Sequence, residues 1–559
     1  MTRRELIFLA VLAVGIASVW MWGAYSPDRT PAAAAEASAA YYPEDAVAYA
    51  SLSLDPTGGQ LEYMTEVVEF FHEFEAVGEW VTHAETLLVD AMGTDFEGIG
   101  AWIGSELSAA IFDLGDGGPG LALAIDVTDQ AAAGEFLARW IERREEDGSG
   151  SFERLAVSEG VIWLGDGPGG WMEEEVYALS ADLMLFSTDR GLIEEVLDHA
   201  SGEESRNLAA NPTFLEARLA APDQRFASAF LDYGRMRELI GDGVGEGGCS
   251  GTFRAPGWMM ASAGWVDGGL VLDLVMPDVT SWWTGTSGEA TAAAVPAGAF
   301  GFVSVGFDPE LDRWRDLLDA CELGVLLPDG GFLGAPQMDR GAVLDEDATA
   351  ADALDAVLAA VEMGIGLDLE QDLFDHLGGE LVVAVHPSDR QDAFIDGVAL
   401  LSHRPLSGRA LAETLDSLVA GIPMGVIAEE VDVGAGSPAR IVEVGEQLSV
   451  GYLVNAGYLT LGTSVEALRS IADAQLAGRG RLADTDRYLR TVGHISYDPR
   501  LLAYVDLETI FDHVDPLEMG TPEGPIEVLT EGFSALALGV GTDGDHSRAT
   551  FVLSTFPDG

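Results

Sequence analysis

The sequence predicts an α+β protein of two tandem related halves, each a mostly antiparallel sheet with helices packed on it, after one N-terminal transmembrane helix. Three observations lead to this prediction. Residues 43–56 and 296–309 align without a gap. Short strand-like stretches are joined by hairpin signals, and strict strand–helix–strand alternation is absent, which disfavours a doubly wound parallel fold. Residues 6–25 carry no charge.

The aligned stretches read PEDAVAYASLSLDP and PAGAFGFVSVGFDP, and each predicts a strand that begins after proline and ends at Asp-Pro. Chance would give about one identity at ordinary residue frequencies. Five positions are identical: Pro43, Ala46, Ser51, Asp55 and Pro56 match Pro296, Ala299, Ser304, Asp308 and Pro309. We therefore interpret them as the opening strands of two related halves.

Matching residues continue along both halves. Glu106 matches Glu380 and Asp232 matches Asp506 at an offset of 274 residues, and Tyr177 matches Tyr452 at 275. Because the opening strands are offset by 253 residues, the second half carries about twenty extra residues, which we place near 325–350. We predict halves at 41–285 and 286–559, too large and too few to be solenoid repeats.

The uncharged run is long enough to span a bilayer as a helix. Arg3 and Arg4 precede it, which favours a cytoplasmic N-terminus and a body outside the cytoplasm. Residues 1–25 then form a cytoplasmic stub and an anchor in the cell membrane, and 26–40 form a linker rich in Pro, Ala, Ser and Glu. The alternative is a signal peptide cleaved within 31–40.

The elements of the first half follow from hydrophobic periodicity and turn residues. Helices on one face of the sheet are expected. In order, we predict a strand at 46–54, a helix near 59–91, paired strands at 102–114 and 121–127, a helix at 130–144, four short strands, a helix at 190–200, a short helix at 208–219, a strand at 226–233, a helical turn, and a hairpin at 258–278. The second half repeats this order.

The composition excludes several classes of function. The chain has 94 acidic against 28 basic residues, a net charge of −66, and it contains no lysine. Schiff-base lysines, phosphate-loop lysines and serine–lysine dyads are therefore excluded, and nucleic acid is a very poor partner. Cations, basic proteins and neutral ligands remain as partners. The acidity is consistent with a saline habitat, whereas a GC-rich genome explains only the missing lysine.

Two cysteines, Cys249 and Cys321, do not make a disulfide framework. Cys321 lies on the apolar face of the sequence LDRWRDLLDAC, which favours a buried thiol over a disulfide, although an exported protein permits both.

Glycine-rich and acidic stretches predict loops rather than sites. GDGPGG (165–170) and GVGEGG (243–248) match a dinucleotide-binding pattern, but neither lies in a strand–helix context, so we expect flexible loops. LDEDATAAD (344–352) and DLGDGG (113–118) lack the alternating ligands of a calcium loop, and solvated acidic loops are expected.

The histidines are scattered and form no metal-binding motif: His72, His83, His199, His376, His386, His403, His494, His513 and His546. His72, beside Glu73 and Glu75, is expected at a solvated helix edge. The acids repeated in both halves, Glu106 with Glu380 and Asp55 with Asp308, are interpreted as structural. We therefore predict no catalytic, cofactor-binding or metal-binding residue.

The opening motif PxDxxxYxSLxLDP, with Trp102, Gly104, Glu106 and Leu107 further on, resembles the uncharacterised bacterial family catalogued as domain of unknown function 3352. The resemblance implies an exported, membrane-tethered protein of unknown role, and it implies no catalytic residues.

The leading functional hypothesis is a non-enzymatic binding or scaffolding protein of the cell envelope, held in the membrane by its N-terminal helix, with protein or cation partners. The alternative is an extracytoplasmic hydrolase that uses acidic residues, with or without a divalent metal. Residues 325–350 and the loop around Cys249 differ between the halves, so we expect distinctive functions there.

Overall fold

The computed structural model describes the greater part of the strands and helices expected from the sequence. The described residues are 36–54, 102–115, 118–146, 150–157, 160–169, 172–202, 206–223, 225–240, 256–277, 292–307, 359, 368–388, 395–421, 428–434, 438–444, 448–455, 457–478, 480–513 and 533–555.

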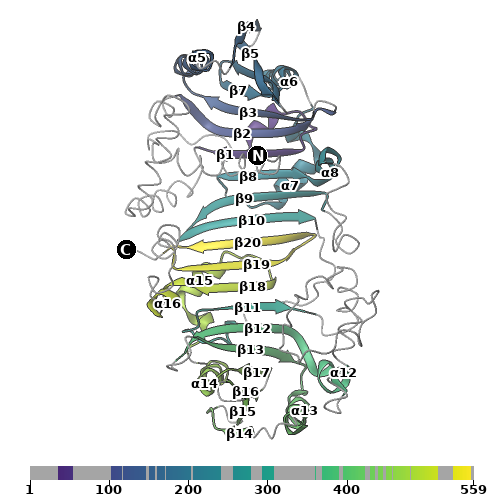
Figure 1. Ribbon diagram of the computed structural model, residues 1–559, viewed down its shortest axis with the longest axis vertical. Helices are drawn as coiled ribbons and strands as arrows, with labels where there is room; N and C mark the ends of the chain where they lie inside the picture. The colour runs from purple at the N-terminus through teal and green to yellow at the C-terminus, as the bar shows by residue number, and fades with distance from the viewer. Residues whose placement is uncertain are drawn as a thin grey trace.

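Twenty strands within these ranges form one antiparallel sheet, stacked along the long axis of the molecule (Figure 1). They are β1 (Ala48–Ser53), β2 (Ile103–Asp113), β3 (Pro119–Val127), β4 (Phe152–Val157), β5 (Gly160–Gly169), β6 (Met172–Leu179), β7 (Leu183–Ser187), β8 (Ala227–Asp232), β9 (Trp258–Val266), β10 (Gly269–Pro277), β11 (Gly301–Gly306), β12 (Leu377–Pro387), β13 (Ile395–His403), β14 (Ala428–Val431), β15 (Ala439–Val444), β16 (Leu448–Val454), β17 (Tyr458–Gly462), β18 (Pro499–Asp506), β19 (Ala535–Asp543) and β20 (His546–Ser554).

The helices of the described ranges connect these strands. The α-helices are α5 (Gln130–Glu146), α6 (Arg190–Ser201), α7 (Pro212–Ala220), α8 (Tyr233–Ile240), α12 (Leu369–Asp372), α13 (Gly408–Gly421), α14 (Val465–Ala472), α15 (Asp486–Val492) and α16 (Leu507–His513). Short 3-10 or π turns are η2 (Ala37–Tyr41), η4 (Leu208–Ala210), η6 (Phe374–His376), η7 (Asp473–Ala477) and η8 (Leu482–Asp484).

Strand pairing gives one unbroken order across the sheet. From one end it runs β4-β5-β6-β7-β3-β2-β1-β8-β9-β10, and it continues through β20-β19-β18-β11-β12-β13-β17-β16-β15-β14. The second series, followed from β14 inward, is the first with every strand number raised by ten. The two series meet where β10 pairs with β20, near the middle of the molecule (Figure 1).

Helices pack on both faces of the sheet, so the expectation of helices on one face is wrong. Strand β6 shows this directly, because its side chains alternate between faces. Val176 packs in a core with Ile193 of α6, whereas the next residue, Tyr177, packs in another core with Phe136 of α5. We call the face that bears α6 and α7 the inner face and the opposite face the outer face.

The α+β class and most predicted elements of the described ranges are confirmed. The predicted helices at 130–144 and 190–200 are α5 and α6, and the hairpin at 258–278 is β9 and β10, turned at Asp267-Gly268. The expectation of a flexible loop at 165–170 is wrong for its described part, because residues 165–169 extend β5 and pair with β6. Gly165 and Asp166 pair with Glu175 and Glu174, so these residues are part of a hairpin despite the glycines.

Several expectations concern residues that the structure does not describe. These are the anchor at 6–25, the helix at 59–91, Asp55, Asp308, His72, His83, both cysteines, and the stretches 243–248 and 325–350. Among the described helices, none combines the length and apolar character that crossing a membrane requires.

Candidate functional site: buried ionic clusters and an open sheet face

Glu36 is held in a buried ionic cluster at the start of the described fold. Its side chain is fully buried, and Arg225 donates to both carboxylate oxygens, from Nε at 2.8 Å and from NH2 at 3.0 Å. Arg218 of α7 adds a third contact, from Nε at 3.0 Å. The residue adopts a positive φ of 74°, a conformation that is uncommon for glutamate. Residues 36–40, at the end of the stretch predicted as linker, are thus part of the packed structure.

Glu106 of β2 lies beside this cluster and fixes η2 against the sheet. Its carboxylate accepts hydrogen bonds from the backbone N–H of Glu36 and of Ser38, each at 3.0 Å, and from the Ser38 hydroxyl at 2.8 Å. Burial raises the pKa of Glu106 to about 7, and the hydrogen bonds from Ser38 act in the opposite direction. Both oxygens are occupied by protein donors, so the geometry is that of a structural acid.

Glu380, the acid 274 residues after Glu106, accepts hydrogen bonds from two hydroxyl groups. The Ser304 hydroxyl donates to it at 3.0 Å and the Tyr458 hydroxyl at 3.4 Å. The sequence offset of 274 aligns the two clamp arginines, Arg218 and Arg225, with Val492 and Pro499. The arginine clamp on Glu36 therefore has no counterpart at these positions of the second half.

A tyrosine, an acid and an arginine join helix to sheet near each end of the molecule. Near one end, Tyr177 donates to Glu175 at 2.5 Å, and Arg144 of α5 donates to the same carboxylate at 2.5 Å. The Trp140 indole donates to the Tyr177 hydroxyl at 2.8 Å. Burial raises the pKa of Tyr177, which keeps the phenol protonated as a donor.

Near the other end the acid and the arginine exchange places. Tyr452 of β16 donates at 2.5 Å to Asp416, which lies on helix α13. Arg440, now on strand β15, lies 3.4 Å from the same carboxylate. The repeated tyrosine therefore keeps its role while the charges are swapped between helix and sheet, as expected for structural ion pairs.

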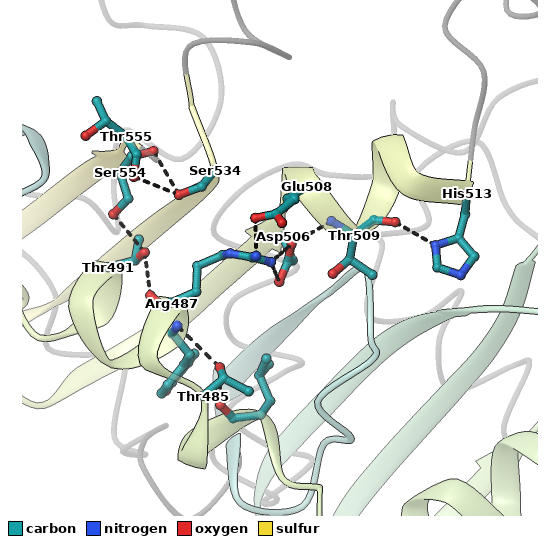
Figure 2. Close-up of polar contacts among 12 residues, drawn as sticks. Thr485, Arg487, Thr491, Asp506, Glu508, Thr509, His513, Ser534, Ser554 and Thr555 are labelled. Carbon is teal, nitrogen blue, oxygen red and sulfur yellow. Dashed lines mark hydrogen bonds and ion pairs between the residues drawn. The ribbon is translucent and has the colours of Figure 1, made fainter. Parts of the chain in front are cut away.

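Figure 2 shows a fourth cluster, around Arg487 of α15. Its guanidinium donates to both oxygens of Asp506, at 2.5 and 2.6 Å, and to Glu508. The Asp506 carboxylate also accepts from the backbone N–H of Thr509 at 2.8 Å and so caps α16. These contacts tie α15, β18 and α16 together, again with the acid fully occupied.

The other acidic candidates are also in structural roles. Asp113, in the stretch 113–118, accepts from the backbone N–H of Gly115 at 2.8 Å and so shapes a turn. Asp126 accepts from Ser105 at 2.8 Å, and burial raises its pKa. Across the residues that the structure describes, His, Asp, Glu and Cys side chains form no group of three able to hold a metal ion.

Within the part of the chain that the structure describes, the middle of the outer face is apolar and partly exposed. Val383, Val303 and Leu272 are 45%, 43% and 39% exposed, and they lie on strands of both series. Pairing places one apolar set on this face across seven neighbouring strands: Met259, Ala261, Ala263; Leu270, Leu272, Leu274, Met276; Ala549, Phe551, Leu553; Leu536, Leu538, Val540; Leu501, Ala503, Val505; Val303, Val305; Leu381, Val383, Val385. We call this set the apolar panel.

The panel is large by the standards of a protein surface. Six strand spacings span about 29 Å across the sheet. Each strand contributes two to four residues at alternate positions, without a charged side chain among them. Among the described helices, α5 and α13 pack on the outer face, toward the two ends of the sheet. Contiguous exposed apolar patches of more than a few hundred Å² mark interaction sites.

Exposed aspartates border the panel at both ends of its strands. Asp267 lies at the turn between β9 and β10, and Asp543 and Asp545 lie at the turn between β19 and β20. Because β10 and β20 are antiparallel neighbours, these turns lie on opposite edges of the panel. The panel is therefore an apolar surface with an anionic rim. Sequence reasoning missed it because strand alternation reveals apolar faces but not which of them stays open.

Residues 6–245 match the profile of a family described as a protein of unknown function (DUF3352). The predicted resemblance is confirmed over these residues. The DUF3352 match includes the opening strand β1, Glu106 and both clamp arginines, and it ends before β9. The match therefore covers strands β1 to β8, and the whole apolar panel lies outside it.

No curated protein matches the chain. Among solved structures, crystal form III of TP0453 is 11% identical, with 45% of this chain and 81% of that chain covered at a TM-score of 0.24. Crystal form IV of TP0453 is also 11% identical, with 43% and 79% covered at 0.24. At these TM-scores the likeness carries no inference about fold or function.

Proposed function

We propose that this protein is a non-enzymatic scaffold of the cell envelope that binds another protein through the apolar panel. The observation that carries the proposal is the panel itself: a broad, charge-free surface on a chain whose net charge is −66. Burying such a surface against a partner gains about 25 cal/mol for each Å² of apolar area removed from water. The ionic clusters described above support a binding role because their acids are engaged in holding helices to the sheet.

The rim chemistry selects the class of partner. Asp267 and Asp545, with Asp543, which also accepts from Arg548, favour a surface whose centre is apolar and whose border carries arginine or lysine. A second copy of this chain would bring its own anionic rim, and the net charge of each chain would oppose the contact. The proposed partner is therefore a protein whose apolar docking surface is bordered by arginine or lysine. This agrees with the basic partners expected from composition.

The proposal is tested by placing charge on the panel. We expect Val303→Glu with Val383→Glu to abolish co-purification of the partner with the detergent-extracted full chain, because buried unpaired carboxylates oppose docking. Leu406→Glu is the matched control, since Leu406 is fully exposed but lies outside the panel.

A captured protein supports the proposal only if the panel variant loses it and the control keeps it. Equal retention by both variants would contradict the proposal. Thermal unfolding of each variant shows whether any loss reflects misfolding, and we expect little change because both valines face solvent.

The two series of strands are proposed to be related halves. Support comes from the shared strand order and from equivalent contacts outside the strands. Pro43 bridges Asn207 in one series, and Pro296 bridges Arg481 in the other. Asn211 caps α7, and Thr485, 274 residues later, caps α15.

We further propose that residues 6–25 anchor the chain in the cell membrane, with the N-terminus cytoplasmic and the body outside. The uncharged run, preceded by Arg3 and Arg4, supports this topology. A protease added outside intact, wall-stripped cells should digest the body, and full protection would contradict the orientation.

A further inference from the structure

Strands β10 and β20 pair as if a local two-fold axis related them. Near the middle of the contact, a residue of β10 faces its own equivalent in β20. The hairpins β9–β10 and β19–β20 close at Val266–Gly269 and Asp543–His546, so equivalent residues differ by 546 − 269 = 277. Asp273 therefore corresponds to residue 550, and Thr550 is also the residue with which Asp273 pairs. This pair lies on the local axis, as in an isologous dimer contact.

The chemistry at the axis breaks this symmetry. The Asp273 side chain is 6% exposed, and its Oδ1 accepts from the Arg548 Nε at 3.0 Å and from the Thr550 hydroxyl at 2.5 Å. Arg548 also donates to Asp543 at 3.1 Å, and its guanidinium lies 5.5 Å from the centre of the Tyr497 ring. The residue equivalent to Arg548 in β10 is Val271, because 548 − 277 = 271. The acid thus lies on one strand and the arginine on the other.

Self-pairing of either strand would remove the ion pair between Asp273 and Arg548. If β10 of one molecule paired in the same register with β10 of another, Asp273 would face Asp273 in a buried position without an arginine nearby. Like charges directly opposite on paired strands are destabilising, and a buried unpaired charge costs far more. If β20 paired with β20, each Arg548 would keep Asp543 of its own hairpin but would lose Asp273.

We propose that Asp273, Arg548 and Thr550 form a pairing lock that makes β10 join β20 of the same chain and rejects the matching strand of a second copy. This inference deepens the proposal of two related halves, whose sheet edges would otherwise be interchangeable. Edge strands pair readily with any compatible strand, so a repeated architecture needs such a device to stay monomeric. The lock combines an attractive intramolecular ion pair with repulsion in the swapped arrangement.

The test compares variants of the full chain in detergent. Asp273→Asn and Arg548→Met each remove one partner and should raise the unfolding equilibrium constant on the order of 100-fold. The double variant removes both and should recover most of that loss. Asp273→Thr with Arg548→Val makes the two strands alike, and two differently tagged copies, co-expressed, should then co-purify several-fold more than wild-type copies do.

Arg487→Met with Asp506→Asn is the matched control, because this ion pair lies within one half. It should change stability without raising co-purification. The lock would be refuted if the double variant lost as much stability as the two single variants together, or if the symmetrised variant co-purified no more than the control. If the symmetrised variant did not fold, Asp273→Asn alone, which removes the repulsion, should still raise co-purification. None of these results depends on the apolar panel, whose own test is loss of a partner.

Discussion

Two arginines hold the Glu36 carboxylate in a site from which water is excluded. Taking an ion from water costs several kcal/mol, and only close, complementary contacts offset that cost. The backbone N–H of the same residue is bound by Glu106, so side chain and main chain are fixed together. This is the point at which the described fold begins, and the contacts fix it firmly to the sheet.

Glu106 should make stability depend on pH. Its pKa of about 7 in the fold lies above the ordinary value of 4.5, so its contribution to stability is fully present below pH 4.5 and is lost as pH rises through 7. We expect Glu106→Gln to remove this part of the pH dependence when unfolding free energies are measured from pH 4 to 8. Glu216→Gln removes an exposed carboxylate and should leave the dependence in place.

His386 should produce the opposite dependence. Burial lowers its pKa from 6.5 to about 4, with Asp396 opposing the shift, so the fold prefers the neutral ring. Its contribution to stability is present above pH 6.5 and is lost as pH falls to 4. His386→Phe copies Phe112, the residue 274 positions earlier. It should flatten the curve of unfolding free energy against pH between pH 4 and 6.5. An unchanged curve would show that the histidine is not desolvated.

At the scale of elements, sequence patterns predicted individual strands well because each buries alternate side chains. The hairpin of β9 and β10 and the helix α6 follow directly from their periodicity and from Asp189, which caps α6 by accepting from the Leu192 N–H. The faces on which helices pack were not predictable. Val176 and Tyr177 are adjacent, apolar and buried on opposite faces of β6. The sequence does not say which helix covers which face.

The cap of α7 offers a prediction at this scale. The Asn211 side chain accepts from the N–H groups of Thr213 and Phe214 and donates to the Glu44 carbonyl. Asn211→Ala should lose about 1–2 kcal/mol of stability in chemical denaturation, because a helix cap is removed. Asn211→Thr copies Thr485, which caps α15, and should lose clearly less. Equal losses would show that the cap contributes little.

At the scale of the whole molecule, the sheet is continuous where two separate sheets were expected. The repeat of residues 43–56 at 296–309 led us to expect two similar series of strands. No sequence pattern in β10 or β20 predicts that these two strands pair with each other. That contact joins residues 269 to 285 positions apart, and it depends on complementary edges such as Asp273 and Arg548. The joined sheet also creates the apolar panel, which neither series contains alone.

The ionic clusters were only partly foreseeable. Repetition led us to interpret Glu106 as structural and showed that Tyr177 matches Tyr452, whereas Arg218 and Arg225 lie in an ordinary helix and loop and show no pattern. Their role depends on Glu36, some 180 residues earlier. The panel was hidden for the same reason: its members come from seven strands of both series.

The central claim is that the apolar panel binds a protein, and the most direct measurement is photo-cross-linking in intact membranes. A photoreactive residue in place of Val383 or Val303 should give one discrete protein adduct, and the same residue in place of Leu219, exposed on α7 of the inner face, should not. Mass spectrometry should identify a partner with a basic rim. Adducts only with lipid or with a second copy of this chain, or equal adducts from Leu219, would contradict the claim.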